Sequence, residues 1–309
     1  MAVELSYCVV NTEQRQLLRY CLDSIARERA AVPFETEVIV LDNASRDGSA
    51  GTARAHGATT EVIALEQRRG KGENDTTLLR RARGRYVLLL NEDSELEPGT
   101  TMALHAALDA LPDAAVAGAT LLSHDGEQQP SAWRFPAPSS ALLTALWLHH
   151  RLVVQSRGAA VRDVDWVQSA ALLVRRDAAD AVGYFDPAFF VYSDEVDFCK
   201  RLRDAGWRVI YVPDARAVTH EPTDEEGRRR IVELSRNRDR YMRKHHSAAA
   251  ARAVRWLTAY TYAIRAAAAV FLPGHDAGRY VRHVRATLAP GHGEGLAERA
   301  AEYNRGRRL

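Results

Sequence analysis

Short apolar runs alternate with amphipathic helical segments along the first two thirds of the chain. Leu5–Val10, Glu37–Leu41 and Arg85–Leu90 have the length and the composition of buried strands. Between the first two, Glu13–Glu28 carries apolar residues at helical spacing. Regular alternation of this kind predicts an α/β fold, in which a mostly parallel, Rossmann-like sheet is flanked by helices.

Polar clusters follow directly where the predicted strands end. Asp42-Asn43 follows the second strand, and Asn91-Glu92-Asp93 follows the strand Arg85–Leu90. Ligands of open α/β sheets bind beyond the carboxyl ends of the strands, so both clusters are candidates for a binding site. Taken alone, the second cluster is more often an ordinary acidic turn. As a site, its oxygen atoms suit Mg²⁺ or Mn²⁺.

Two further positions could carry chemistry. Asp194-Glu195 opens a predicted helix, where acidic residues are favoured by any helix N-terminus. The functional alternative is a general base that removes a proton from a hydroxyl group. His220 follows the last predicted strand, Arg208–Val212, and fits either an ordinary hydrogen-bonding role or a metal ligand beside Asp93.

The segment Arg68-Arg-Gly-Lys-Gly72 precedes a helix predicted over Asn74–Arg83. Such a loop could approach phosphate through backbone N–H groups near Gly70 and through the ammonium group of Lys71. It lacks the spacing of a P-loop, and a solvated turn is an equally good interpretation.

Charge divides the chain of 309 residues unevenly. Residues 223–309 carry 18 Lys and Arg against 9 Asp and Glu, a net charge of +9, whereas residues 1–222 carry 24 against 31, a net charge of −7. We therefore expect a catalytic domain over 1–222, with halves 1–93 and 94–222, and a basic helical extension over 223–309. The extension fits either a helical pair packed on the domain or peripheral contact with an anionic membrane.

Location follows from what the sequence lacks. No signal peptide or confident membrane span is recognised, since the most apolar part of the extension, 256–272, is short and carries Arg265. Cys8, Cys21 and Cys199 have no disulfide or zinc-site spacing. We expect a cytoplasmic protein, with the inner face of the membrane as the alternative, and no nucleic-acid partner.

An ordered series of blocks resembles the family-2 glycosyltransferases with the GT-A fold, and within them the rhamnosyltransferase-like group. In the N-terminal part the blocks are Val9-Val-Asn11, Val38 through Gly48, Gly70-Lys-Gly72 and Ala82 through Asp93. The later blocks are Gln129-Pro-Ser131, Arg134-Phe-Pro136, Asp165-Trp166, Ala171 through Arg176 and Phe185 through His220. Each block is weak by itself, and their shared order carries the resemblance.

The resemblance implies roles for individual residues. It implies that Asp42 reads the pyrimidine base, that Asp93 is the last acid of a DXD-type metal motif helped by His220, and that Glu195 is the base. The other residues that it implies for the nucleotide sugar are Val10, Asn11, Asn43, Gly70, Lys71, Asn91 and Glu92.

Three departures from the family pattern affect this site. Asn91 replaces the first acid of the metal motif. The acid pair reads Asp194-Glu195 instead of Glu-Asp, so Asp194 remains an alternative base. Glu13 and Arg68-Arg69 stand where the family usually has a small polar residue and Asn-Leu.

The sequence therefore predicts an inverting, metal-dependent hexosyltransferase. The resemblance favours a dTDP- or UDP-sugar donor with a rhamnose-like sugar; the acceptor is a glycan, a lipid-linked molecule or a natural product. A non-catalytic nucleotide-sugar-binding homologue is an alternative. A nucleotidyltransferase fits less well, because the loop after the first strand, Val10 through Gln14, has no glycine. The sugar, the linkage and the oligomeric state stay open.

Overall fold

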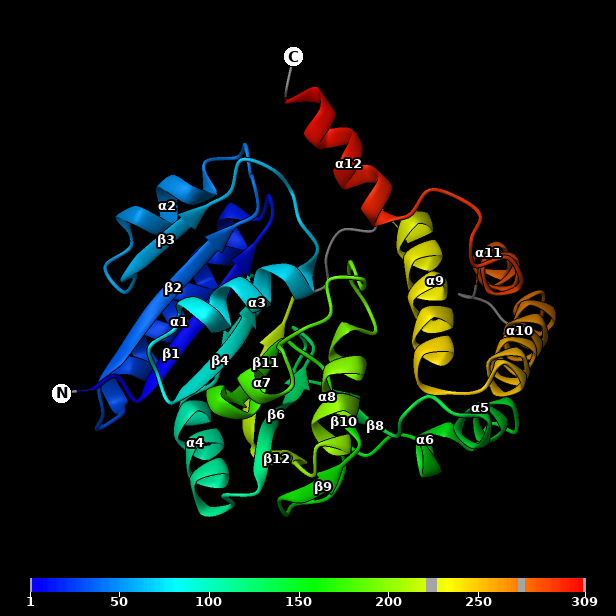
Figure 1. The fold of residues 1–309 in the computed structure, drawn as a ribbon, viewed down its shortest axis with the longest axis horizontal. Helices are drawn as coiled ribbons and strands as arrows, with labels where there is room; N and C mark the ends of the chain where they lie inside the picture. Colours follow the sequence, from blue (N-terminus) through cyan, green and yellow to red (C-terminus); the bar gives the residue numbers. More distant parts are fainter. Residues whose placement is uncertain (1, 221–226, 272–275, 308–309) are drawn as a thin grey trace. The chain divides into compact units, whose positions relative to one another are not determined.

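The computed structural model describes residues 2–220, 227–271 and 276–307 (Figure 1). The chain divides into two compact units. The first contains Met1–Trp133, Gln155–Ala188 and Asp194–Pro222, and the second contains Arg134–Val154, Phe189–Ser193 and Thr223–Leu309. The residues around the boundary expected at 222–223 lie outside the described part. Two segments from the middle of the sequence group with the C-terminal helices, which the sequence did not predict.

A ten-stranded sheet forms the centre of the first unit. Its main path has the order β3-β2-β1-β4-β11-β6-β12-β5, and β7 and β9 pair with β6 and β12. The strands are β1 (Leu5–Asn11), β2 (Thr36–Asp42), β3 (Glu61–Ala64), β4 (Tyr86–Asn91), β5 (Ser94–Leu96), β6 (Ala114–Leu122), β7 (Gln128–Gln129), β9 (Arg162–Val164), β11 (Ala171–Arg175) and β12 (Arg208–Thr219). Along the main path only β11 and β5 run against the common direction. A separate pair joins β8 (Ala132–Trp133) to β10 (Trp166–Val167).

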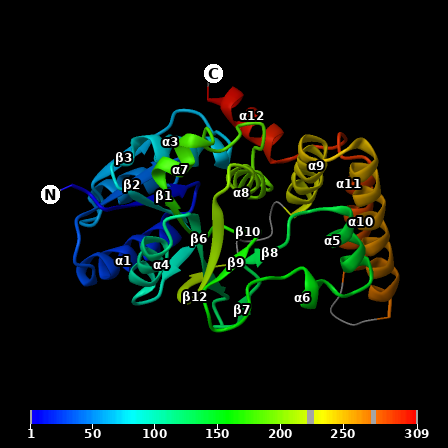
Figure 2. The same cartoon turned by 60° about the horizontal axis from the view of Figure 1, so that its bottom comes forward.

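Helices cover both faces of this sheet (Figure 2). They are α1 (Arg15–Ala31), α2 (Ser49–Ala55), α3 (Lys71–Arg81), α4 (Thr100–Ala110), α7 (Arg176–Ala181) and α8 (Asp194–Asp204). Figure 2 shows α1 and α4 on one face, and α3, α7 and α8 on the other. Every residue of β1 is buried because helices pack on both sides of it. Alternate residues divide between the faces, and Leu5, Tyr7 and Val9 join the core under α1 and α4.

Two predicted strands differ from the structure. The strand expected over Asp165–Arg175 is two strands, because Val167 pairs with β8 whereas Ala171 begins a ladder with β4. The strand expected to end at Val212 continues to Thr219 after a register shift between Val212 and Arg216. The added part of β12 pairs with β5, so the extra length depends on a partner distant in sequence.

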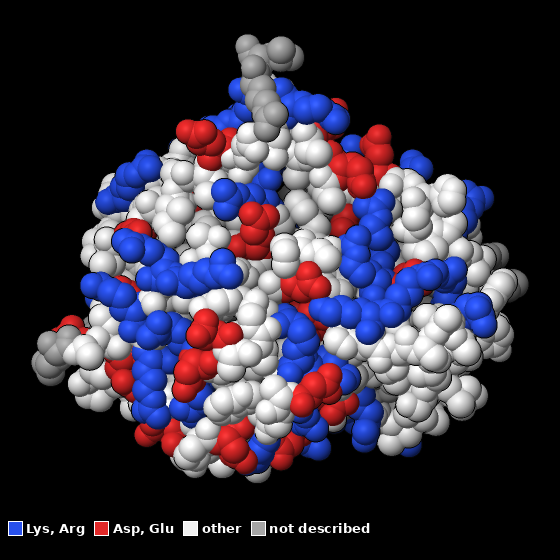
Figure 3. Space-filling view, viewed as in Figure 1, with Lys and Arg blue, Asp and Glu red and all other residues white. Residues whose placement is uncertain are grey.

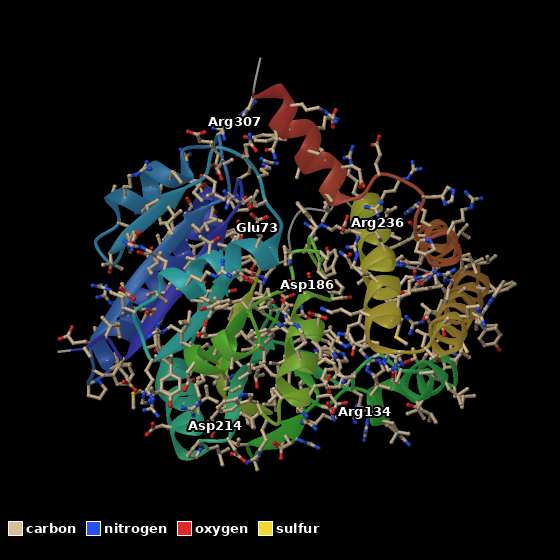
Figure 4. The ribbon with its side chains drawn as sticks, viewed as in Figure 1. Glu73, Arg134, Asp186, Asp214, Arg236 and Arg307 are labelled. Carbon is tan, nitrogen blue, oxygen red and sulfur yellow. The ribbon has the colours of Figure 1, made fainter. Side chains whose placement is uncertain are left out.

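The second unit is helical. It contains α5 (Pro138–Ala145), α6 (His149–Leu152), α9 (Gly227–His245), α10 (Ala248–Ala269), α11 (Ala277–Leu288) and α12 (Leu296–Gly306). Glu233 on α9 is buried, and its carboxylate accepts hydrogen bonds from Asn237 Nδ2 and from the backbone N–H of Ala297 at the start of α12. Arg236, labelled in Figure 4, reaches Glu298 of α12 with Nη1–Oε distances of 2.8 and 3.0 Å. Buried charge therefore fixes α12 to α9. No helix in the described ranges is long and apolar enough to cross a membrane.

Candidate active site

Parallel register brings the ends of three strands to one edge of the sheet. Asn11 on β1 is opposite Asp42 on β2, and Val10 is opposite Asn91 on β4. Asn11 Nδ2 donates to Asp42 Oδ1 at 2.9 Å, and the backbone N–H of Ser45 donates to Asp42 Oδ2 at 3.0 Å. These bonds hold the buried carboxylate of Asp42 in one orientation at the carboxyl end of the sheet.

Asn43 connects this edge to the loop before α3. Its Nδ2 donates to the carbonyl oxygen of Arg69 at 3.1 Å, and its Oδ1 accepts from the backbone N–H of the same residue at 2.9 Å. The side-chain amide of Asn43 thus pairs with the backbone of Arg69 as a neighbouring strand would, and it holds Arg69 beside the end of β2. Gly70 follows as the N-cap residue of α3.

Glu13 and Arg68, two of the departures from the family pattern, form an ion pair. Arg68 Nη2 donates to Glu13 Oε1 at 2.6 Å, and Glu13 Oε2 accepts from the backbone N–H of Arg46 at 3.0 Å. Glu13 has a φ of 57°, which a residue with a side chain adopts only at a conformational cost. Residues from three separate loops contribute to this arrangement. The ion pair therefore stabilises these loops beside the carboxyl ends of the strands.

Pairing of β5 with β12 brings Asp93 next to His220. Ser94 lies opposite Thr219, and one residue further the backbone N–H of His220 donates to the carbonyl oxygen of Asp93 at 3.0 Å. The side chain of His220 lies toward Glu95, with 3.4 Å between Nε2 and Oε2. The two residues expected to share a metal are therefore neighbours.

Glu92 precedes Asp93 in the chain and is half-buried. Burial and the nearby charge of Asp93 raise the pKa of Glu92 to about 8. Its Oε1 accepts from the backbone N–H of Thr12 at 3.3 Å, which connects this turn to the end of β1. In the described part of the chain, no group of three or more His, Cys, Asp or Glu side chains is arranged to hold a metal ion.

Lys71 lies among three carboxylates in the same unit. The helix α3 begins at Lys71, three residues earlier than the sequence predicts, and Figure 4 labels Glu73 in its first turn. Lys71 Nζ is 2.6 Å from Asp75 Oδ2, 3.4 Å from Glu195 Oε1 and 3.9 Å from Asp194 Oδ2. Burial lowers the pKa of Lys71, but the surrounding carboxylates raise it above its usual value. Lys71 is therefore a counter-ion to acids, a role that neither sequence interpretation of this loop, a phosphate contact or a solvated turn, includes.

Asp194 and Glu195 have different surroundings in the first turn of α8. Ser169 Oγ donates to Glu195 Oε1, and the Glu195 side chain is 11% exposed. The Asp194 side chain is 1% exposed, and neither of its oxygens has a hydrogen-bond partner. Burial and repulsion from Glu195 raise the pKa of Asp194 above its usual value. The two acids are thus unequal: the Glu195 carboxylate has a hydrogen-bond donor, whereas Asp194 is enclosed without one and favours its protonated form.

Other buried polar atoms of this unit also have no partner within the described residues. Among them are Oδ1 of Asn11 at the end of β1 and both amide atoms of Asn74 on α3. Buried polar groups in proteins are normally hydrogen-bonded, and exceptions mark places where a ligand or water completes the structure. Asn11 thus has an acceptor available at the same edge as Asp42.

The structure brings most of the predicted site residues together and adds three that the sequence did not indicate. The structure joins Asn11, Asp42 and Asn43 in one network, Asp93 and His220 in a second, and Lys71, Asp194 and Glu195 in a third. The missed residues are Asp75, Ser169 and Glu95. The spacing of Lys71 and Asp75 at i and i+4 could have indicated their ion pair. Nothing in the sequence near Ser169 indicates its contact with Glu195.

The sequence profile described as "Glycosyltransferase like family 2" matches residues 4–256. The matched range includes the carboxyl ends of β1, β2 and β4, the neighbours Asp93 and His220, and the acid pair Asp194-Glu195. The chain belongs to glycosyltransferase family 2. Its α/β sheet with flanking helices has the GT-A architecture.

Two curated relatives of this glycosyltransferase are rhamnosyltransferases. It is 33% identical over 144 residues to the N-acetylglucosaminyl-diphospho-decaprenol L-rhamnosyltransferase of Mycobacterium tuberculosis, covering 44% of this chain and 47% of that protein. It is 38% identical over 61 residues to rhamnosyltransferase WbbL of Escherichia coli K12, covering 20% of this chain and 23% of that protein. The chain spans about half the length, or less, of the curated relatives that it matches.

Solved glycosyltransferases share the fold. The mannosyltransferase PcManGT of Pyrobaculum calidifontis, in complex with GDP-Man and Mn²⁺, matches with a TM-score of 0.60 and 17% identity, over 94% of this chain and 86% of that one. TarS 1-349 of S. aureus, in complex with UDP-GlcNAc, matches with a TM-score of 0.57 and 14% identity, over 92% and 79% of the two chains. At these identities the likeness concerns the fold alone.

Proposed function

We propose that the chain is an inverting hexosyltransferase that moves a rhamnose-like sugar from a dTDP- or UDP-sugar to a hydroxyl group of a glycan, lipid-linked or natural-product acceptor. Membership of family 2 and the rhamnosyltransferase relatives support the reaction class. The observation that carries the proposal is the position of Glu195, whose carboxylate accepts a hydrogen bond from Ser169 and lies next to Lys71.

Glu195 is the proposed base. A general base must be ionised and must reach the proton that it removes. Glu195 accepts a hydrogen bond from Ser169 and lies 3.4 Å from the ammonium group of Lys71, and its side chain is 11% exposed, against 1% for Asp194. Asp194 is enclosed and favours protonation, so it serves as the second acid of the pair. One displacement at the anomeric carbon by the activated hydroxyl inverts the configuration there.

The strand edge is the proposed donor site. Asp42 keeps lone pairs for a pyrimidine ring beyond those used by Asn11 and Ser45. Val10, Asn11, Asn43, Gly70, Asn91 and Glu92 surround the same edge and are proposed to line the nucleotide sugar. Lys71, at the start of α3, is proposed to place its charge near the diphosphate in addition to pairing with the acids.

Asp93 and His220 would hold Mg²⁺ or Mn²⁺. The backbone bond between them makes the two residues neighbours, and a carboxylate and an imidazole are suitable donors for such an ion. Asn91 occupies the place of one further acid, so donor phosphate oxygens and water have to complete the shell. When bound, the ion neutralises charge on the departing diphosphate. Mn²⁺ in the PcManGT complex is consistent with this assignment.

The test is release of nucleoside diphosphate from a panel of UDP- and dTDP-sugars with Mn²⁺. Glu195→Gln should lower kcat by about 10²- to 10⁴-fold and leave donor binding intact, because only the proton acceptor is removed. Asp194→Asn is the matched control and should retain most of the turnover. Loss of turnover in Asp194→Asn alone would contradict the assignment of the base. Donor binding without turnover in the wild type, across acceptors of all three classes, would favour a non-catalytic binding protein.

A further inference from the structure

The helices α5, α6, α10 and α11 of the second unit leave large apolar side chains in solvent. On α10, the residues Trp256, Tyr260 and Ile264 recur along one face, and Phe271 follows the end of the helix; Trp256 and Phe271 are 65% and 84% exposed. Figure 3 shows the surface over α5 and α10, on the right of the view, as largely white. Exposed apolar side chains that gather on one surface indicate an interaction site.

The turn between α5 and α6 adds a second group of such side chains. Leu146 and Trp147 are 57% and 56% exposed, and Leu142 and Leu152 are also exposed. Trp147 has a φ of 62°, a conformation that costs a bulky residue energy. Arg265 of α10 lies over its ring, 5.5 Å from the centroid. A strained backbone conformation at an exposed tryptophan is typical of a functional surface.

The charged side chains on these helices are positive. The sequences of α5, α6, α10 and α11 contain no Asp or Glu. Exposed arginines lie on three of these helices: Arg151 on α6, Arg252 on α10, and Arg279, Arg282 and Arg285 on α11. Asp276, just before α11, is paired with Arg282 at 3.0 Å.

We propose that this surface, formed by α5, α6, α10 and α11, docks on an anionic lipid bilayer. Indole, phenol and phenyl rings insert at the level of the headgroups, while arginines pair with anionic phosphates. The same surface is poorly suited to a second copy of the chain, because a two-fold interface would place arginines against arginines with no acid to neutralise them. The docking goes beyond the proposed reaction and does not depend on it.

The tryptophans provide a reporter that needs no substitution. The chain has five tryptophans, and Trp147 and Trp256 are the exposed ones among them. The wild-type chain should sediment with vesicles of phosphatidylglycerol and phosphatidylcholine but not with phosphatidylcholine alone, and high salt should weaken the binding. Brominated lipid in the anionic vesicles should quench part of the tryptophan fluorescence. Equally poor sedimentation with both vesicles, or no quenching, would overturn the proposal.

Variants separate the apolar and charged contributions. Trp256→Ser with Phe271→Ser should reduce sedimentation several-fold, and Arg279→Glu with Arg285→Glu should abolish the preference for anionic vesicles. Met102→Ser, on α4 of the first unit, is the control and should bind as the wild type does. A concentration-dependent dimer of the wild type that the first variant dissociates would assign the surface to a second copy instead. Since vesicle binding is measured without donor or acceptor, it can fail while sugar transfer is retained.

Discussion

Lys71 illustrates how the surroundings of one residue set its chemistry. From sequence, Lys71 fits either a phosphate contact or a solvated turn; in the structure its ammonium group is 2.6 Å from the carboxylate of Asp75. Within the same cluster Asp194 is enclosed and Glu195 is hydrogen-bonded by Ser169. Different burial of two adjacent carboxylates is what separates their expected roles.

Stability should depend on pH through Asp194. Its pKa in the folded chain is raised, so above the ordinary aspartate pKa of about 4 the folded state binds more protons at this site than the unfolded state. Stability therefore falls as pH rises through that window. In Asp194→Asn this loss is absent, and the Tm of the variant relative to the wild type should increase from about pH 5 to about pH 8. The exposed Asp125→Asn is the control, and a difference that shrinks with pH in Asp194→Asn would contradict the assignment.

Ser169 should act as a positioning residue for Glu195. Ser169→Ala removes the hydroxyl that donates to the Glu195 carboxylate. A hydrogen bond to a charged group contributes about 1.5 to 3 kcal/mol, so kcat should fall by roughly 10- to 100-fold while KM for the donor stays unchanged. Restoration of turnover in Ser169→Thr is expected if the hydroxyl is what matters. Ser24→Ala, which removes a buried hydroxyl of α1, should lower Tm and leave kcat unchanged.

At the scale of elements, strand pairing decides which predictions succeed. The strands β1, β2 and β4 were predicted because a run buried on both faces is apolar throughout. The length of β12 and the division of 165–175 into β10 and β11 were not, since they depend on pairing with β5, β8 and β4. Local patterns report burial, whereas the partner of a strand is set by distant residues.

Gly118 on β6 tests the close packing of β6 under β10. A Cβ atom added there would lie 2.5 Å from Cβ of Val167. Gly118→Ala should therefore destabilise the fold by about 1 to 3 kcal/mol, as overpacked cores do. Because Val167 lies two residues before Ser169, kcat should also fall. Denaturant unfolding and turnover measure the two effects, and Gly51→Ala, where nothing lies within 4 Å of the added atom, is the control.

At the scale of the whole molecule, the chain consists of two compact units that each have buried side chains of their own. Calorimetry should resolve separate unfolding transitions for the two units. Glu233→Ala removes the buried carboxylate that holds α12 to α9 and should lower the free energy of unfolding of the second unit by about 1.5 to 3 kcal/mol. Gly118→Ala should lower the free energy of unfolding of the first unit. A single transition lowered by both variants would contradict this division.

The sequence by itself determined the α/β class, the positions of the polar clusters and the basic character of the C-terminal helices. These properties are local, because strand and helix periodicity, turn residues and charge are read from neighbouring residues. Tertiary structure alone decided that Asp93 meets His220, that Glu13 pairs with Arg68, and that Asp75 and Ser169 join the acid pair. Most of these contacts join residues distant in sequence, which only the register of the sheet and the docking of α3 and α8 bring together.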